Sequence, residues 1–118
     1  MAKILAVEDE ALVRILIVET LAGAGHGVLE AADGESALAI VRQTPDLDLV
    51  VTDVRMSKMD GFSLARFARE VRPDLPVLFM TGYMGADVPA TIPDAKVLQK
   101  PFDPDDLLAA IEVMLAAR

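Results

Sequence analysis

Several short apolar segments of this chain lead into residues that can bind a metal ion or a phosphate. These are Lys3–Val7 before Glu8-Asp9-Glu10, Leu47–Thr52 before Asp53, Pro76–Met80 before Thr81, and Val97–Gln99 before Lys100. If the segments are parallel strands, their carboxyl ends share one edge of a sheet, where ligands bind at the switch in strand order. We therefore expect the four sets of residues to converge.

The acidic residues Glu8, Asp9 and Asp53 suggest a metal site. Three carboxylates in one pocket repel one another and need a cation, and ligands that are all oxygen favour Mg²⁺ over Zn²⁺. The alternative for Glu8-Asp9-Glu10 is a set of acids that interact with the positive end of a helix. Asp53 favours the metal site, because a carboxylate at the end of Leu-Val-Val-Thr is costly to bury unless it has partners.

Thr81 and Lys100 could complete a phosphate site at the same edge. Neighbouring strands are about 4.8 Å apart, so a group on the fifth strand starts roughly 10 Å from one on the third, and lysine is long enough to reach it. Lys100 would hold a phosphoryl oxygen or pair with Asp53, and the Thr81 hydroxyl could donate to another oxygen. Taken alone, Thr81 is more typical of a turn at the end of a strand, and Lys100 is more typical of a solvated surface charge. The bond before Pro101 is one that can be cis, which would direct the lysine inward.

Composition limits the class of protein. A chain of 118 residues is expected to form one domain, and its 53% hydrophobic and 4% aromatic content is typical of a parallel sheet covered by helices on both faces. No apolar run approaches the ~18 residues of a membrane span, and the start does not resemble a signal peptide. A net charge of −8 argues against nucleic acid as a partner, and the chain has no cysteine. We expect a soluble cytoplasmic protein that does not bind a membrane.

Strand-like and helical patterns alternate along the chain. Helices are predicted over Ala11–Ala22, Glu35–Gln43, Gly61–Val71 and from Asp103 to about Ala117, with one more strand at Val28–Ala31. Asp33, Asp60 and Asp103 stand where helices should begin. The pattern predicts a three-layer α/β sandwich with a five-stranded parallel sheet of flavodoxin-like order 2-1-3-4-5. The glycines and prolines of Gly82–Lys96 predict that its helix, the fourth, is short or irregular, with at most a turn near Ala86–Thr91.

Three motifs occur in order along the chain. They are Val7-Glu8-Asp9-Glu10, the segment Asp53–Gly61 with the pattern D-x-x-M-x-x-M-D-G, and Lys100-Pro101-Phe102. Over its whole length the chain resembles a two-component response-regulator receiver domain of the chemotaxis-regulator type. The resemblance implies that Asp53 is the phosphoacceptor, that Thr81 is the switch hydroxyl and that Lys100 contacts the phosphoryl group. It also implies that Glu8 and Asp9 bind Mg²⁺ together with the backbone carbonyl of Arg55.

The chain departs from the family pattern at two positions. Ser57 stands where the family usually has proline, and Val97 stands three residues before Lys100, where a Tyr or Phe normally rotates on phosphorylation. The segment Pro76–Tyr83 resembles the P-F-x-F-A-T-G-Y motif of FAT GUY receivers. We therefore expect the signal to travel through Gly82–Lys96, with Tyr83 as the substitute for the missing ring.

The resemblance implies a signalling switch and not a turnover enzyme. A sensor histidine kinase or a histidine phosphotransfer protein would donate the phosphoryl group to Asp53, and a downstream protein would bind the product. The alternative is a phosphorylation-independent receiver that acts as a scaffold or phosphate sink, because the usual aromatic residue is missing. A flavodoxin is disfavoured because the acidic first loop would repel phosphate, and a haloacid dehalogenase phosphatase because Arg55 stands where a second Asp is needed.

The first predicted helix carries two apolar stripes. Val13, Leu16, Ile17 and Leu21 form one stripe at helical spacing, and Leu12, Ile15 and Val18 form a second stripe on roughly the opposite face. Either the helix is buried on two sides, or the second stripe is exposed and binds a partner. In the exposed case Leu12 and Ile15 are the predicted docking residues for the kinase.

Overall fold

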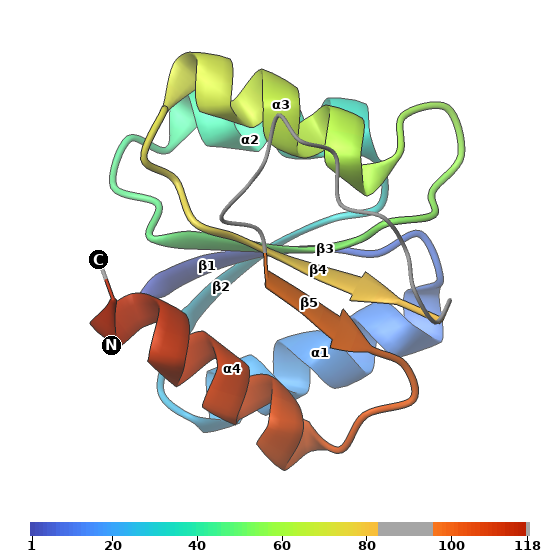
Figure 1. The fold of residues 1–118 in the computed structure, drawn as a ribbon, viewed down its shortest axis with the longest axis vertical. Helices are drawn as coiled ribbons and strands as arrows, with labels where there is room; N and C mark the ends of the chain where they lie inside the picture. Colours follow the sequence, from blue (N-terminus) through green and yellow to red (C-terminus); the bar gives the residue numbers. More distant parts are fainter. Residues whose placement is uncertain (83–95, 118) are drawn as a thin grey trace.

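The computed structural model describes residues 1–82 and 96–117 of the chain, and a five-stranded parallel sheet lies at its centre. The strand order is β2-β1-β3-β4-β5, as predicted. In Figure 1, α2 and α3 cover one face of the sheet and α1 and α4 cover the other. The strands are β1 (Lys3–Val7), β2 (Gly27–Ala31), β3 (Leu49–Asp53), β4 (Val77–Thr81) and β5 (Lys96–Gln99). The helices are α1 (Ala11–Gly23), α2 (Gly34–Gln43), α3 (Gly61–Val71) and α4 (Pro104–Ala116).

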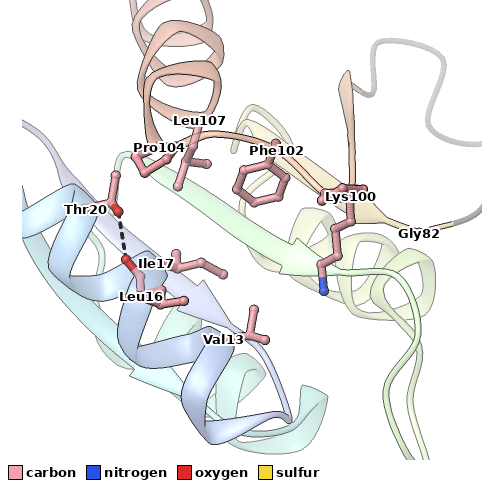
Figure 2. Close-up of a pocket in the computed structure, with 10 residues that line it drawn as sticks. Val13, Leu16, Ile17, Thr20, Gly82, Lys100, Phe102, Pro104 and Leu107 are labelled. Carbon is pink, nitrogen blue, oxygen red and sulfur yellow. Dashed lines mark hydrogen bonds between the residues drawn. The ribbon is translucent and has the colours of Figure 1, made fainter.

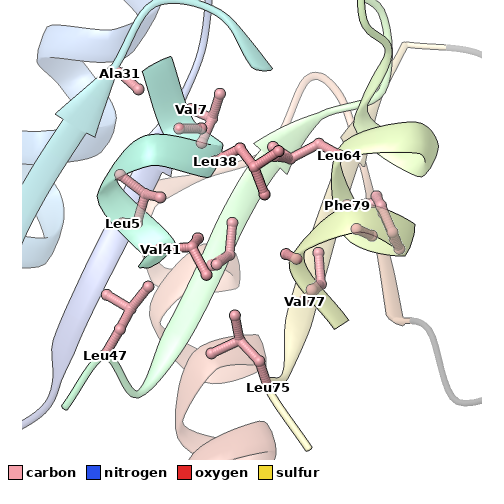
Figure 3. Close-up of a cluster of buried hydrophobic side chains, with 14 residues drawn as sticks. Leu5, Val7, Ala31, Leu38, Val41, Leu47, Leu64, Leu75, Val77 and Phe79 are labelled. Carbon is pink, nitrogen blue, oxygen red and sulfur yellow. The ribbon is translucent and has the colours of Figure 1, made fainter. Parts of the chain in front are cut away.

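The central strands send alternate side chains to two separate cores, because successive side chains of a strand point to opposite faces. One core lies beneath α2 and α3 and includes Leu5, Val50 and Phe79 (Figure 3). The other lies beneath α1 and α4 and includes Ile4 and Val51. All residues of β3 and β4 are buried. The two cores fix the sheet on both faces and leave its carboxyl edge for chemistry.

Three predicted helix starts are confirmed. The side chain of Asp33 accepts a hydrogen bond from the Ser36 N–H at 2.7 Å, and that of Asp60 accepts from the Ser63 N–H at 2.8 Å. At the start of α4, Asp103 is the N-cap residue and forms a capping box in which its N–H donates to the Asp106 side chain at 3.2 Å. These bonds satisfy N–H groups that have no partner within the helix.

Several strand boundaries differ from the predicted ones by one or two residues. β3 begins at Leu49 and not Leu47, because the Leu47 N–H donates to the Thr44 carbonyl at 3.1 Å and so belongs to the preceding turn. β3 also includes Asp53, and β4 includes Thr81. The two candidate site residues are therefore the last residues of buried strands, held by the backbone ladder.

The predicted division of α1 into two apolar stripes is wrong at Leu16. Leu16 is 63% exposed, whereas Val18 of the second stripe is partly buried against the core. Both lie about 100° around the helix from Ile17, on opposite sides, so packing decides which one is covered. Leu12 and Ile15 are exposed at 77% and 47%, which rules out a helix buried on two sides.

Two predictions concern residues outside the described part of the chain. The short turn expected near Ala86–Thr91 lies in 83–95, as does Tyr83. Within residues 1–82 and 96–117, no helix has both the length and the apolar character needed to cross a membrane.

Candidate functional site

Three carboxylates meet at the carboxyl edge of the sheet. Asp53 ends β3 and Glu8 follows the last residue of β1, which pairs with β3 through Val7 and Thr52. Oxygen atoms of Glu8, Asp9 and Asp53 all lie within 4.8 Å of one another. Glu8 is only 1% exposed, and its N–H donates to the Ala31 carbonyl of β2 at 3.1 Å. The convergence expected from the strand order is therefore observed.

Lys100 reaches this cluster from the end of β5. Its Nζ lies 2.7 Å from Glu8 Oε1 and 3.4 Å from Asp53 Oδ2, so it bridges two of the three acids. Its backbone N–H donates to the Thr81 carbonyl at 2.7 Å. The sequence suggested Asp53 as the partner, but the shorter contact is to Glu8. A carboxylate as buried as Glu8 needs a paired cation.

The charges of the cluster shift two pKa values. Burial, a hydrogen bond with Glu8 and the charge of Glu8 together raise the pKa of Asp9, despite opposing hydrogen bonds from backbone N–H groups. Burial alone would lower the pKa of Lys100, but its hydrogen bond with Glu8 and the charges of Asp53 and Glu8 raise it overall. The cluster combines three carboxylates with one lysine, and its oxygen-only set of donors fits a hard cation such as Mg²⁺.

The segment after Asp53 is held close to it. The Val54 N–H donates to the Met80 carbonyl at 3.0 Å, and the Gly61 N–H donates to the Val54 carbonyl at 2.8 Å. A Cβ on Gly61 would lie 2.3 Å from the backbone oxygen of Asp53, so only glycine fits where α3 begins. The hydrogen bond from Gly61 to the Val54 carbonyl thus ties the start of α3 to the residue that follows β3. Arg55 is exposed in the segment between them.

Thr81 and Val97 occupy different environments. Thr81 is 3% exposed at the end of β4, one residue beyond Met80, which is the register partner of Asp53. Val97 lies in β5 opposite Phe79 and is 41% exposed. The peptide bond between Lys100 and Pro101 is cis, as the sequence allowed.

Arg14 and Glu30 also belong to this region, although the sequence pattern did not predict them there. Arg14 Nη1 donates to the backbone carbonyl of Glu8 at 2.8 Å, and Arg14 Nε donates to Glu30 Oε1 at 3.0 Å. The available signal was that Arg14 is the only cation in an otherwise mostly apolar helix. Its position six residues after Glu8 does not by itself predict a contact with that carbonyl.

An apolar groove lies beside the cluster, between α1 and the segment that joins β5 to α4 (Figure 2). It has a volume of about 630 Å³, and Leu16 and Ile17 line one side while Phe102 and Leu107 line the other. Lys100 also lines it. The exposed Leu12 and Ile15 belong to the same helix, α1. The chain therefore presents an apolar surface next to its charged edge.

A parallel sheet of order 2-1-3-4-5, with an acidic cluster and a lysine at its carboxyl edge, defines a flavodoxin-like domain whose charged residues lie where such sheets bind their ligands. The chain belongs to the response regulator receiver domain family of two-component systems, whose model matches residues 4–112.

Similar proteins support this assignment. The response regulator receiver protein CpdR of Brucella abortus is 41% identical over 123 residues, which cover 99% of this chain and 99% of that protein. The solved receiver domain of the hybrid histidine kinase CckA is 37% identical, with a TM-score of 0.84 and coverage of 96% of this chain and 98% of that one. The chemotaxis protein CheY4 of Vibrio cholerae is 33% identical, with a TM-score of 0.88 and coverage of 97% and 98%.

Proposed function

We propose that this receiver domain takes a phosphoryl group onto Asp53 from a phosphohistidine, with Mg²⁺ bound beside it, and thereby acts as a signalling switch. The observation that carries the proposal is the arrangement of Glu8, Asp9 and Asp53 within 4.8 Å, with Lys100 in contact with two of them. The raised pKa of Asp9 supports a cation at this position, because a cation would relieve the repulsion between the carboxylates.

The residues of the site would have two roles, the binding of Mg²⁺ and the orientation of Lys100. Asp9, Asp53 and the backbone carbonyl of Arg55 would hold Mg²⁺, which when bound neutralises charge on the transferring phosphoryl oxygens. One oxygen of Glu8 binds Lys100 and the other accepts the Glu10 N–H at 3.2 Å. In this arrangement Glu8 contributes charge and orients Lys100, and it would have to exchange a partner to ligate the ion directly.

The transfer itself needs little covalent machinery. A carboxylate oxygen of Asp53 attacks phosphorus, the bond from phosphorus to the histidine nitrogen breaks, and the nitrogen keeps the electron pair. Lys100, already 3.4 Å from Asp53, is placed to contact a phosphoryl oxygen. The Thr81 hydroxyl would donate to another oxygen and begin the conformational switch. The protein thus assists its own phosphorylation without being a turnover enzyme.

The donor would be a sensor histidine kinase or a histidine phosphotransfer protein. Support comes from the similarity to a receiver domain that belongs to a hybrid histidine kinase. Leu12 and Ile15, exposed on the helix that starts two residues after Asp9, form the proposed docking surface. A downstream protein would bind the phosphorylated form, and the role of Tyr83 as a reporter remains a prediction.

The test uses the full chain and a phosphorylated kinase or acetyl phosphate. We expect Asp53→Asn to abolish the hydroxylamine-sensitive phosphoryl label while the far-ultraviolet circular dichroism spectrum stays the same, because the change removes the nucleophile and keeps its shape. Undiminished label on this variant would refute the assignment of Asp53.

A second experiment distinguishes the switch from the alternative function, a phosphorylation-independent scaffold. The alternative is favoured by Val97, which is exposed and stands in place of an aromatic residue. Beryllofluoride with Mg²⁺ imitates the phosphoryl group. Chemical shift changes that extend from Asp53 to Thr81 would support a switch. Partner binding that is equal with and without beryllofluoride would support the scaffold.

A further inference from the structure

We infer that Arg14, held by Glu30, is a positioning residue that orients the Glu8–Asp9 peptide for metal binding. This inference rests on the proposed function, since it concerns the Mg²⁺ site described there. It assigns a role to an ion pair that contributes no atom to the acidic cluster itself.

The Glu8 peptide groups are held from two directions. β1 ends at Val7, and beyond it the Glu8 N–H donates to the Ala31 carbonyl of β2 at 3.1 Å. The Glu8 carbonyl, which belongs to the peptide bond that leads into Asp9, accepts from Arg14 Nη1 at 2.8 Å. Rotation of this peptide would move Asp9 away from Asp53.

Arg14 is itself fixed. Its N–H donates to the Glu10 carbonyl at 2.9 Å in the first turn of α1, and its Nε donates to Glu30 Oε1 at 3.0 Å. Glu30 lies on β2 in register with Ala6 of β1. The Arg14 side chain is 19% exposed and that of Glu30 is 53% exposed. One guanidinium therefore joins the end of β1, the start of α1 and the edge strand β2.

Arg14 can orient the Glu8 carbonyl only if its two donors, Nε and Nη1, belong to one rigid group. A guanidinium presents several N–H groups in a fixed plane, whereas the ammonium of lysine is a single point on a flexible stem. Lysine at this position could reach the Glu8 carbonyl or Glu30, but it could not hold both in the same geometry. Arg14→Lys should therefore keep the charge and lose the orientation.

The competing explanation is that Arg14 only offsets negative charge near the cluster. The two explanations predict opposite changes in the Mg²⁺ affinity of Arg14→Gln. If charge alone matters, removal of the cation in Arg14→Gln strengthens Mg²⁺ binding, and removal of the acid in Glu30→Gln weakens it. If orientation matters, both variants weaken Mg²⁺ binding, because both loosen the Glu8–Asp9 peptide.

The experiment measures the Kd for Mg²⁺ alone, by isothermal titration calorimetry on the full chain. We expect Arg14→Gln to raise the Kd about tenfold, as loss of a residue that supports a metal ligand commonly does. Arg14→Lys should recover little of this loss, and Glu30→Gln should raise the Kd by a smaller factor. Matched controls are the exposed residues Arg42→Gln on α2 and Glu19→Gln on α1, which should leave the Kd nearly unchanged.

A second readout needs no metal. Hydrogen exchange at the Asp9 amide in EDTA should be several-fold faster in Arg14→Gln, while exchange at Val51 in the middle of β3 stays the same. If wild-type protein binds no Mg²⁺ but this exchange is still faster, the proposed metal site fails and the positioning contact stands. If Arg14→Gln binds Mg²⁺ as tightly as wild type or more tightly, or if exchange at Asp9 is unchanged, the inference is wrong. Should Arg14→Gln fail to fold, Arg14→Lys decides the question by the same two measurements, because an effect of charge alone would leave its Kd for Mg²⁺ and its exchange at Asp9 unchanged.

Discussion

Replacement of Lys100 by methionine should destabilise the metal-free protein strongly. The change removes the ammonium 2.7 Å from Glu8 and leaves a carboxylate that is 1% exposed beside Asp9 and Asp53. Loss of one partner of a buried ion pair costs about 3–5 kcal/mol. Because the Lys100 side chain is 25% exposed, water already screens part of the pair, and we expect a loss at the low end, about 3 kcal/mol.

Substitution of the other partner of the pair, Glu8, should cost much less stability. Glu8→Gln removes the buried charge itself and leaves Lys100 within 3.4 Å of Asp53, so the expected loss is about 1 kcal/mol. The double variant Lys100→Met/Glu8→Gln contains no buried unpaired charge at position 8. It should therefore be more stable than the sum of the single losses predicts, with a coupling energy of about 2 kcal/mol.

The pH dependence of this pair has a defined sign. The pKa of Lys100 is raised in the folded protein from its ordinary value of 10.5. Its contribution to stability is therefore fully present below that ordinary value and is lost as the pH rises through the higher folded value. Wild type and Lys100→Met should differ most at neutral pH and converge in strong alkali.

Urea unfolding in EDTA, followed by far-ultraviolet circular dichroism, measures these differences, since the chain has no tryptophan and only one tyrosine. Lys3→Met is the matched control. Lys3 makes an equally short ion pair with Asp46, at 2.6 Å, but the side chains are 41% and 68% exposed, so little change is expected. If Lys100→Met loses no more stability than Lys3→Met, burial does not make the Glu8–Lys100 pair important.

Three further predictions follow from the site. Asp9→Asn should weaken Mg²⁺ binding in a titration. It should also raise the metal-free stability by up to about 1 kcal/mol at neutral pH, because a carboxyl whose pKa is raised destabilises the fold above that pKa. Urea unfolding should show that this gain in stability vanishes as the pH falls below 3.8, the ordinary pKa of an aspartate side chain. Ile15→Glu should slow phosphotransfer from a kinase but not phosphorylation by acetyl phosphate, and equal loss with both donors would indicate misfolding instead of lost docking. Gly61→Ala should cost about 1–3 kcal/mol in urea unfolding and slow phosphorylation of Asp53, because its Cβ would lie 2.3 Å from the Asp53 oxygen. Gly23→Ala, with open space around its Cβ, is the control.

The fold and the convergence of the acids could be predicted because both depend on local patterns. Buried strands appear as short apolar runs, and capping residues such as Asp33 and Asp60 mark the beginnings of helices. Once the strand order is known, the residues that follow the strands must lie at one edge. Glu8, Asp9 and Asp53 follow from this rule without any knowledge of side-chain conformation.

The contacts that could not be predicted depend on how side chains are oriented between elements. Whether Lys100 lies closer to Glu8 or Asp53 is a matter of tenths of an ångström in side-chain placement. The exposure of Leu16 depends on which side of α1 the sheet covers, and periodicity places Leu16 and Val18 symmetrically about Ile17. The bond from Arg14 to the Glu8 carbonyl joins a side chain to a backbone group, for which a sequence carries no periodic signal.

Charged side chains of alternating sign lie between the edge strand β2 and Asp53, the proposed phosphoacceptor. Glu30 contacts Arg14 on α1, and at the carboxyl edge Glu8 contacts Lys100, which also contacts Asp53. Under the proposed function, a phosphoryl group on Asp53 adds negative charge and competes with Glu8 for Lys100. Complete transfer of Lys100 to the phosphoryl group would leave the buried Glu8 unpaired, which is unfavourable unless another cation is near. Mg²⁺ beside Asp9 would supply that positive charge. The Glu8–Lys100 pair therefore couples phosphorylation of Asp53 to the binding of Mg²⁺. Removal of Mg²⁺ should then destabilise the phosphorylated protein more than the unphosphorylated protein.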